Sequence, residues 1–239
     1  MAWTHRWGGS RQMQKKAKAD NSTERPVTIV DPSSHAAEAY RTLRTNLLHG
    51  FVDGPKIILI TSYGPGEGKS STCANLAVVL AQTGKNVLAV DCDLRKPRLH
   101  RYFGLRNIWG IGDILMGVCS LEDVWEEPIE KLKVVSAGSI PPNPTECLDS
   151  SRLAEFLAKV REEFDYVLLD SSPVGLVSDP AILATQSDGV LLVLDAQSTR
   201  KAYVRQSVRS LEAVGANVMG TVVNNIEKSN GDPYHRYYT

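Results

Sequence analysis

The sequence lacks long apolar runs, and neither sign of charge is in excess. Apolar runs such as KIILI and GVLLVL are far shorter than the ~20 residues that a membrane-spanning helix requires. Lysine and arginine together number 27, and so do aspartate and glutamate, so the formal net charge is zero. Binding to nucleic acid through bulk charge is therefore not indicated. The N-terminus also lacks the apolar segment of a secretory signal, so we expect a soluble, cytoplasmic protein without a nucleic-acid partner.

Cysteine is scarce, and its spacing excludes several kinds of site. The four cysteines, Cys73, Cys92, Cys119 and Cys147, lie far apart and form no C-x-x-C pair. Cys73 and Cys92 fall inside apolar segments, which predicts buried, reduced thiols. The same scatter counts against a protein that shares an iron–sulfur cluster between two subunits.

Charge is unevenly distributed along the chain, although it sums to zero. The first twenty residues contain five lysines or arginines and a single acid, Asp20. We expect residues 1–26 to form a flexible basic arm, with weak contact to an anionic membrane surface or an acidic partner as the alternative. Residues 227–239 are turn-rich and aromatic and are expected to form a free tail. The remainder, 27–226, is predicted to be one folded domain.

Between these ends, short β-rich runs alternate with helical patterns. Strands are predicted at 56–61, 86–90, 132–136, 166–169, 189–194 and 218–223. Helices are predicted at 33–50 (with Ser33 or Ser34 as N-cap), 69–83, 150–163, 180–184 and 201–214. The strand runs show little alternation, which indicates burial on both faces. The pattern predicts a doubly wound, mostly parallel sheet flanked by helices, which is a three-layer α/β/α fold.

A glycine-rich turn follows the first predicted strand and leads into a helix. Its sequence, GPGEGKSS, comprises Gly64, Pro65, Gly66, Glu67, Gly68, Lys69, Ser70 and Ser71. Backbone N–H groups in such a turn can cradle phosphate oxygens, aided by the helix dipole. Lys69 would reach the β- and γ-phosphates of ATP, and the Ser70 hydroxyl would bind Mg²⁺. The loop is of the Walker A type except that Tyr63 replaces its first glycine; a glycine turn that binds nothing is the alternative.

Three carboxylates fall where predicted strands end. In VLAVDCDLR, Asp91 and Asp93 are two residues apart, so in an extended segment both side chains face one way. Asp170 ends the strand of YVLLDSSP. Ligands of open α/β sheets bind beyond the carboxyl ends of strands, so we expect all three beside the phosphate loop. Asp170 and Asp91 are candidate Mg²⁺ ligands, Asp91 is also the candidate general base, and Asp93 is an orienting group.

Further polar residues stand next to these strand ends. Arg95 and Arg98 follow the two aspartates and could hold phosphate oxygens or pair with the acids, or they could be plain surface arginines. Asn224 and Asn225 end the last predicted strand, in MGTVVNN. A side-chain amide there could read the edge of adenine, and an ordinary loop asparagine is the alternative.

Together these motifs resemble the bacterial tyrosine kinases, P-loop NTPase-type enzymes that phosphorylate their own C-terminal tyrosines and control the export of capsule or exopolysaccharide. The matching segments are SYGPGEGKSS, VLAVDCDLRKP, YVLLDSSP, SAGSIPPNPTECL and EAYRTLRTN. The resemblance implies that Lys69, Asp91, Asp93 and Asp170 are catalytic positions that handle ATP and Mg²⁺. Ser172 departs from the pattern, because many relatives have proline there.

The resemblance also implies a ring-shaped homo-oligomer. Glu38, Arg41 and Arg44 match an E-x-x-R-x-x-R oligomerisation motif, although their spacing alone would favour a solvated helix face. A ring would allow the tail of one chain to enter the site of its neighbour.

Three tyrosines close to the end of the chain are the expected phosphate acceptors, namely Tyr234, Tyr237 and Tyr238. The split form of the family implies a membrane-embedded activator, a polysaccharide co-polymerase, whose cytoplasmic segment recruits the kinase to the inner face of the membrane. Other protein tyrosines are further candidate substrates.

Two other functions suit the same fold. A partition ATPase of the ParA/MinD type would pass the phosphoryl group to water, but its loop needs an early lysine where this chain has Gly64. Such a protein also carries a C-terminal amphipathic helix rather than clustered tyrosines. A non-catalytic regulator could bind ATP and signal through assembly, and the intact Lys69, Asp91, Asp93 and Asp170 count against it.

Overall fold

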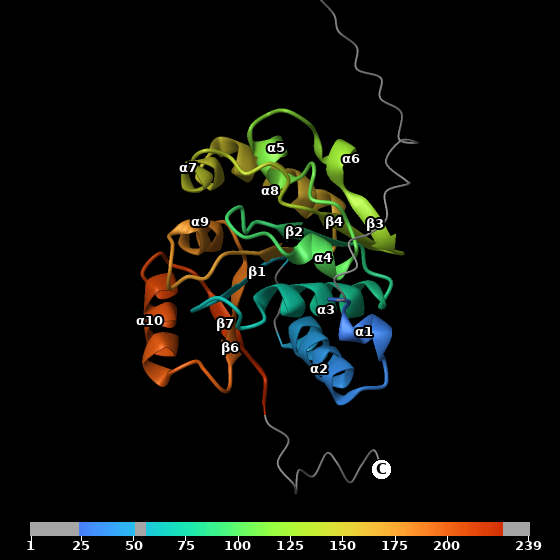
Figure 1. Ribbon diagram of the computed structural model, residues 1–239, viewed down its shortest axis with the longest axis vertical. Coiled ribbons are helices and arrows are strands. Elements are labelled where there is room, and N and C mark those ends of the chain that lie inside the picture. The colour runs from blue at the N-terminus through green and yellow to red at the C-terminus, as the bar shows by residue number, and fades with distance from the viewer. Residues whose placement is uncertain (1–23, 51–55, 227–239) are drawn as a thin grey trace, which may run out of the picture.

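The computed structural model describes residues 24–50 and 56–226, whose strands form one seven-stranded sheet between two layers of helices (Figure 1). The strands are β1 Ile57–Ser62, β2 Val87–Asp91, β3 Glu126–Ile129, β4 Leu132–Val135, β5 Tyr166–Asp170, β6 Gly189–Asp195 and β7 Val218–Asn224. Their order in the sheet is β3-β4-β2-β5-β1-β6-β7. All neighbouring pairs are parallel except β3 and β4, which are antiparallel.

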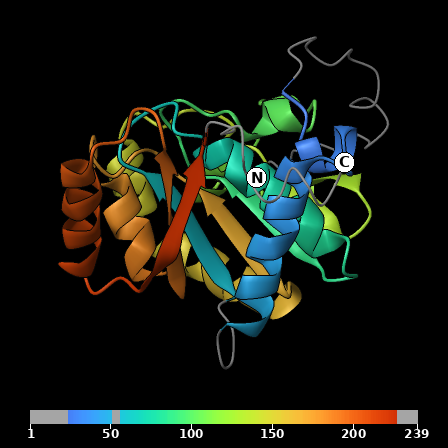
Figure 2. The same cartoon turned by 90° about the horizontal axis from the view of Figure 1, so that it is seen from below.

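Helices cover both faces of this sheet. One face packs against α1 Val27–Val30, α2 His35–His49, α3 Lys69–Ala81 and α4 Leu99–Tyr102. The other face packs against α5 Ile111–Leu115, α6 Leu121–Val124, α7 Pro144–Leu148, α8 Ser151–Glu163, α9 Asp179–Thr185 and α10 Lys201–Glu212. Figure 2 shows α10 at the outer flank, with the strands between it and α2. The three-layer α/β/α prediction is confirmed.

The central strands are buried along their whole length because helices cover both of their faces. Every residue of β1 and of β2 is buried. Side chains of one strand serve both layers: Ile57 and Leu59 face one core, and Ile58 and Ile60 face the other. This accounts for the near-continuous apolar sequence IILI, since a strand with one wet face would alternate.

Helix α3 is the most deeply buried helix and carries the candidate lysine. All of its residues except Ser71 are buried, which requires apolar side chains around its whole circumference. The helix begins directly after Gly68, which has φ 95°, a left-handed conformation that glycine adopts without strain. The phosphate loop therefore ends at a rigid helix in the middle of the fold.

The predicted strands are all present, and the structure adds one. β3 has the sequence EEPI at the edge of the sheet, where proline and glutamate are tolerated because one side of the strand has no partner. The long predicted helices are also present. Ser34 is confirmed as the N-cap of α2, because its hydroxyl accepts a hydrogen bond from the Ala37 N–H.

Two predictions about burial and membranes can be checked directly. Cys73 and Cys92 are free and buried, as predicted, and burial raises the pKa of both thiols well above the usual range. Within residues 24–50 and 56–226, none of the helices is both long and apolar enough to cross a bilayer.

Candidate active site

The phosphate loop connects β1 to α3 and contains two glycines with positive φ. Gly66 and Gly68 have φ 81° and 95°, so their N–H groups turn in a direction that other residues rarely allow. A Cβ atom built at Gly64 or Gly66 would meet nothing within 4 Å. The described residues leave free space beside these two glycines, and the position of the loop at the start of α3 adds the positive end of the helix dipole.

Glu67 fixes the loop through hydrogen bonds to the backbone and to a distant segment. It is 5% exposed, and its carboxylate accepts the Gly64 N–H at 3.0 Å and the Thr199 hydroxyl. The Glu67 carbonyl accepts a hydrogen bond from the Asn224 side-chain amide at 3.0 Å. Tyr63 stacks on Tyr203 of α10 with a centroid separation of 4.2 Å. The loop is thus attached to the segment between β6 and α10 and to the end of β7.

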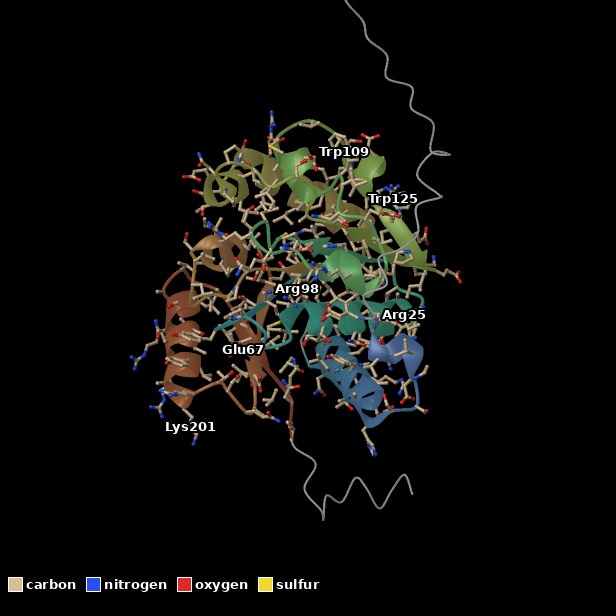
Figure 3. All side chains as sticks on the ribbon, in the orientation of Figure 1. Arg25, Glu67, Arg98, Trp109, Trp125 and Lys201 are labelled. Atoms are coloured by element: carbon tan, nitrogen blue, oxygen red, sulfur yellow. The ribbon has the colours of Figure 1, made fainter. Side chains whose placement is uncertain are left out.

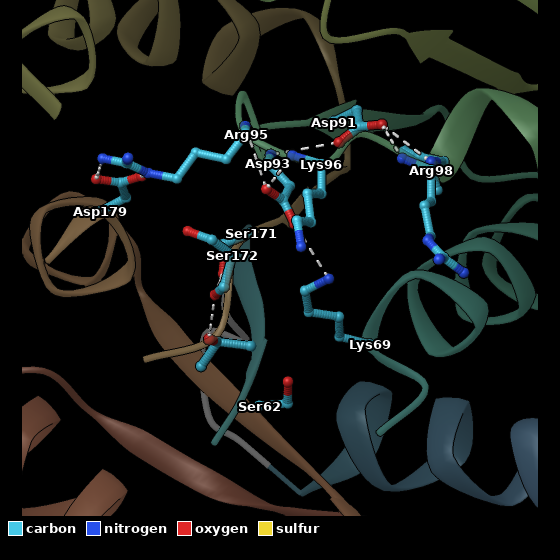
Figure 4. A network of polar contacts seen from close by, with 12 residues as sticks. Ser62, Lys69, Asp91, Asp93, Arg95, Lys96, Arg98, Ser171, Ser172 and Asp179 are labelled. Carbon is cyan, nitrogen blue, oxygen red and sulfur yellow. Dashed lines mark hydrogen bonds and ion pairs between the residues drawn. The ribbon is translucent and has the colours of Figure 1, made fainter. Parts of the chain in front are cut away.

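Lys69 points to the carboxylates beyond the strand ends. Its Nζ lies 3.2 Å from Asp93 Oδ2, and the lysine is 9% exposed (Figure 4). Burial lowers the pKa of Lys69, but the charges of Asp170, Asp93 and Asp91 outweigh it and leave the pKa raised. Lys69 therefore remains a cation at neutral pH, as a phosphate ligand requires.

Asp91 and Asp93 organise the turn that follows β2. Asp91 Oδ2 accepts the N–H groups of Arg98 at 3.0 Å and Leu99 at 2.9 Å, and its Oδ1 accepts the Asp93 N–H at 3.3 Å. Asp93 Oδ1 accepts the N–H groups of Arg95 and Lys96. Burial raises the pKa of Asp91, only partly offset by His100 and the Leu99 N–H.

Asp170 is the carboxylate that lacks partners. It is fully buried, and neither of its oxygens has a hydrogen-bond partner among the described residues. Burial raises its pKa to about 8, although the Lys69 charge and the nearby Ser70 hydroxyl act against this. The ionised form of such a carboxylate is costly in a dry site, and a divalent ion bound beside it would favour that form.

The donor set suits Mg²⁺ held partly by its substrate. Asp170 and Ser70 supply oxygens, the ligand type that Mg²⁺ prefers. Among the residues that the structure describes, no three His, Cys, Asp or Glu side chains converge as a complete metal cage. That agrees with the usual mode of Mg²⁺ binding, with one or two protein ligands supplemented by phosphate and water.

Arg95 is directed away from the phosphate loop. Its guanidinium donates to both oxygens of buried Asp179, at 2.8 and 3.2 Å, and to the Thr145 hydroxyl at 2.9 Å. Thr145 in turn donates to Asp179 Oδ1 at 2.7 Å. Burial raises the pKa of Asp179, but the bonds from Arg95 and Thr145 outweigh it and hold the pKa below its usual range. The predicted contact of Arg95 with the nucleotide stays a prediction, and the direction of its side chain towards Asp179 does not favour it.

Asn224 meets the phosphate loop from the end of β7. Its amide nitrogen donates to the Glu67 carbonyl at 3.0 Å and lies 3.4 Å from the Thr72 hydroxyl. A Cβ at Gly68 would collide with this amide. The predicted contact of the Asn224 amide with adenine stays a prediction, and its donor is already used by the Glu67 carbonyl. Asn225 follows with φ 55°.

The oligomerisation triad lies on α2. Arg41 Nη1 is 2.6 Å from Glu38 Oε2, and its other nitrogen donates to the Pro32 carbonyl. Arg44 donates to the Val79 carbonyl of α3 at 3.2 Å, and its buried Nε has no hydrogen-bond partner within the described residues. The predicted acceptors Tyr234, Tyr237 and Tyr238 lie outside the described residues.

Sequence reasoning missed the residues that hold the site in shape. Asp179 and Thr145 position Arg95, and Thr199 holds Glu67. His100 Nδ1 lies 4.0 Å from Asp91 Oδ2. Asp179 had one local signal, because Asp-Pro commonly begins a helix. The contacts of Arg95 with Asp179 and of Thr199 with Glu67 join positions far apart in the sequence, which no local pattern marks.

Comparison with known proteins decides between the possible functions. Residues 55–221 match the family described as an AAA domain. The chain is 37% identical over 227 residues to tyrosine-protein kinase YwqD of Bacillus subtilis, covering 94% of this chain and 96% of YwqD. This chain belongs to the bacterial tyrosine-protein kinase family. The kinase is also 34% identical over 209 residues to tyrosine-protein kinase CpsD of Streptococcus agalactiae, covering 85% of this chain and 91% of CpsD.

Solved structures agree with this assignment. The kinase domain of the Escherichia coli tyrosine kinase ETK superposes with a TM-score of 0.83 at 30% identity, over 94% of this chain and 89% of that one. The chimerical protein CapA2B2 gives a TM-score of 0.81 at 33% identity, over 84% and 90%. The septum site-determining protein MinD of Pyrococcus horikoshii is more distant, with a TM-score of 0.63 at 26% identity over 73% and 72%.

Proposed function

We propose that this kinase transfers the γ-phosphoryl group of ATP to tyrosine hydroxyls, with Tyr234, Tyr237 and Tyr238 as its own acceptors. We further propose that the reaction regulates the synthesis or export of a capsular polysaccharide or exopolysaccharide. The observation that carries the proposal is the convergence of Lys69 with three carboxylates beside the phosphate loop, in a chain related to tyrosine-protein kinases over nearly its full length.

Binding of ATP would begin at the phosphate loop. Its N–H groups and Lys69 would take the phosphates, and the side-chain oxygen of Asn224 would accept a hydrogen bond from the adenine amino group. Lys69 would keep its ion pair with Asp93 and donate its remaining N–H groups to the β- and γ-phosphates. Asp93 would then orient the lysine, because Lys96 and Arg95 hold its other oxygen in place.

The metal would be held by Asp170 and Ser70, with Asp91 close behind. When bound, Mg²⁺ supplies positive charge that neutralises the phosphate oxygens during transfer. Ionised Asp170 is costly without that cation, because its environment is dry and Asp91 and Asp93 add negative charge. Binding of the metal and loss of the Asp170 proton are therefore linked.

In the transfer step, Asp91 would accept the proton of the tyrosine hydroxyl. The tyrosine oxygen forms a bond to the γ-phosphorus as the bond to the β,γ-bridging oxygen breaks, and ADP leaves. Asp91 Oδ1 accepts a single backbone N–H, at 3.3 Å, so this oxygen keeps a lone pair for the proton. A pKa raised by burial makes the carboxylate a better base near neutral pH.

Assembly would bring the acceptor tyrosines to the site. We propose a ring homo-oligomer through Glu38, Arg41 and Arg44, with the tail of one chain entering the site of the next. The placement of the three residues on one helix, α2, supports this proposal. We propose a membrane-embedded activator with a cytoplasmic segment as the partner that brings the kinase to the inner face of the membrane, and other protein tyrosines as possible substrates.

The second candidate, ATP hydrolysis of the partition type, draws on the similarity to MinD. Gly64 stands where that type of loop needs lysine. The destination of the γ-phosphate distinguishes the two functions. We expect label from γ-³²P-ATP on protein tyrosine; release of labelled inorganic phosphate with unlabelled protein would favour the ATPase.

A mixing experiment tests transfer between chains. One full-length chain carries Lys69→Met and an intact tail, and the other carries Tyr→Phe at positions 234, 237 and 238 with an intact site. We expect label on the Lys69→Met chain in the mixture and on neither chain alone. No label on the Lys69→Met chain in the mixture, under conditions where the unmodified protein labels its own tail, would contradict transfer in trans.

A further inference from the structure

A group of exposed cations adjoins the site, and the binding of ATP described above does not use it. From residue 94 to residue 112 the chain contains no aspartate or glutamate. The same stretch carries five exposed cationic side chains: Arg95, Lys96, Arg98, Arg101 and Arg106. In a protein whose formal net charge is zero, this clustering creates a local positive potential.

The backbone fixes part of this group directly onto the catalytic carboxylates. The N–H of Lys96 donates to Asp93 Oδ1 at 3.0 Å, and the N–H of Arg98 donates to Asp91 Oδ2 at 3.0 Å. Figure 4 shows the side chains of Arg95 and Arg98 leaving the turn in opposite directions. The backbone positions of Lys96 and Arg98 are therefore set by the same turn that holds Asp91 and Asp93.

These cations differ in what they already contact. Arg95 is committed to Asp179. The Arg98 side chain is 57% exposed, and its ion pair with Glu24 is 4.0 Å long, beyond hydrogen-bond range. Arg98 lies near the middle of the face seen in Figure 3, above the phosphate-loop residue Glu67. Lys96, Arg98 and Arg101 form what we call the basic rim.

We propose that the basic rim binds negative charge beside the tyrosine being phosphorylated, so that the kinase prefers acceptor segments that are acidic or already carry phosphotyrosine. This inference rests on the proposed function and names its acceptor class. A phosphotyrosine brings a charge of about −1.5 to −2 and three acceptor oxygens, which an arginine can bind in bidentate fashion. In a tail with Tyr237 next to Tyr238, the first phosphate would assist the second transfer.

The test uses the full chain with Tyr→Phe at positions 234, 237 and 238, so that only added peptides accept phosphate. The peptides have the sequence of residues 227–239, either unmodified or with phosphotyrosine at position 238. KM for each peptide is measured at saturating ATP–Mg²⁺, together with KM for ATP. Rim variants are Lys96→Gln with Arg98→Gln, and Arg101→Gln alone. Arg209→Gln, an exposed arginine in the last turn of α10, is the matched control.

We expect KM for the phosphorylated peptide to be roughly five- to tenfold lower than for the unmodified peptide, as for a charge-assisted bond weakened by solvent. The ratio should fall towards one in the rim variants and at raised salt, and should persist in Arg209→Gln. Equal KM values in the parent, or a ratio that survives in both rim variants, would overturn the inference. A rise in KM for ATP with an unchanged peptide ratio would assign the rim to the nucleotide instead.

Failure of the inference and failure of the kinase function give different results. Transfer to the unmodified peptide establishes kinase activity whether or not the rim discriminates. If no peptide is labelled, the affinity of fluorescent peptides for the protein with ADP–Mg²⁺ can be measured by anisotropy. This tests binding at the basic rim without turnover. Tighter binding of the phosphopeptide, lost in the rim variants, supports the inference; equal binding overturns it.

Discussion

Asp170 is a fully buried carboxylate whose oxygens have no hydrogen-bond partner among the described residues. Its pKa of about 8 lies above that of an unfolded aspartate, so between those two values the folded protein binds more protons than the unfolded chain. Its contribution to stability is fully present at acidic pH and is lost as the pH rises towards 8. A bound cation would reverse that loss.

This gives a prediction for Asp170→Asn without Mg²⁺ or nucleotide. The amide carries no charge to bury, so Tm at pH 8 should rise above that of the unmodified protein by about 2–4 °C for each kcal/mol gained. The difference should shrink at pH 5, where Asp170 is protonated. Thermal unfolding at both pH values measures it, and the added stability from ATP–Mg²⁺ should be lost.

Asp188→Asn is the matched control, for which we expect a change in Tm of the opposite sign. Asp188 accepts two bonds from Arg161 as well as the N–H groups of Lys56 and Ile57. Burial raises the pKa of Asp188, but these partners outweigh it and hold the pKa low. The contribution of Asp188 to stability is therefore present above the pKa of an unfolded aspartate and is lost as the pH falls below it. We expect this variant to lower Tm at pH 8. A fall in Tm for both variants would contradict the account of Asp170.

Arg95 is a second residue whose role depends on contacts that only the fold creates. Thr145→Val removes the hydroxyl that bridges Arg95 and Asp179. This change should lower the free energy of unfolding by about 1 kcal/mol. If Arg95 acts by shaping the turn of Asp91 and Asp93, kcat should fall while KM for ATP changes little. A rise in KM for ATP alone would instead place Arg95 on the nucleotide.

Among the elements, the segment between β6 and α10 controls the shape of the phosphate loop. Thr199→Val removes one hydroxyl bond to buried Glu67 and should weaken ATP binding about fivefold, which corresponds to about 1 kcal/mol. Thr199→Ser keeps the hydroxyl and should restore affinity. Calorimetric titration with ADP–Mg²⁺ measures both, and unchanged affinity in Thr199→Val would show that the loop does not need this support.

Elements with strong local patterns could be predicted from the sequence, and elements fixed by packing could not. β1 and β2 could be predicted because each contains an unbroken apolar run bounded by polar residues. By contrast, β3 is a four-residue edge strand that contains Pro128. Helix α1 has the sequence VTIV, whose β-branched residues favour a strand in isolation. It is held as a helix where buried Thr28 donates twice to Asn75 of α3.

The same division applies to the site. The motif positions Lys69, Asp91, Asp93 and Asp170 could be predicted because each stands at a strand end or helix start within a short pattern. The partners of Arg95 and Glu67 could not, because Asp179 is 84 residues from Arg95, and Thr199 is 132 residues from Glu67. Contacts across such distances depend on the order of strands in the sheet.

For the whole molecule, assembly should depend on the triad of α2. Replacing Arg41 and Arg44 together with alanine should shift the protein towards smaller species in light scattering, and Tm should fall as well because Arg44 loses its bond to the Val79 carbonyl. Arg209→Ala is the control for a change in charge. An unchanged mass for the double variant would exclude this face of α2 from the ring contact.

The central claim is that Lys69 and its three carboxylates move phosphate from ATP to tyrosines of the tail. The most direct measurement is the intact mass of the full chain after incubation with ATP–Mg²⁺ and a candidate activator segment, followed by mapping of the tail peptide. A Lys69→Met chain is treated in parallel. The account predicts phosphate on Tyr234, Tyr237 or Tyr238 in the unmodified chain and none in the variant. Equal labelling of both chains, or ATP turnover with an unmodified tail, would contradict it.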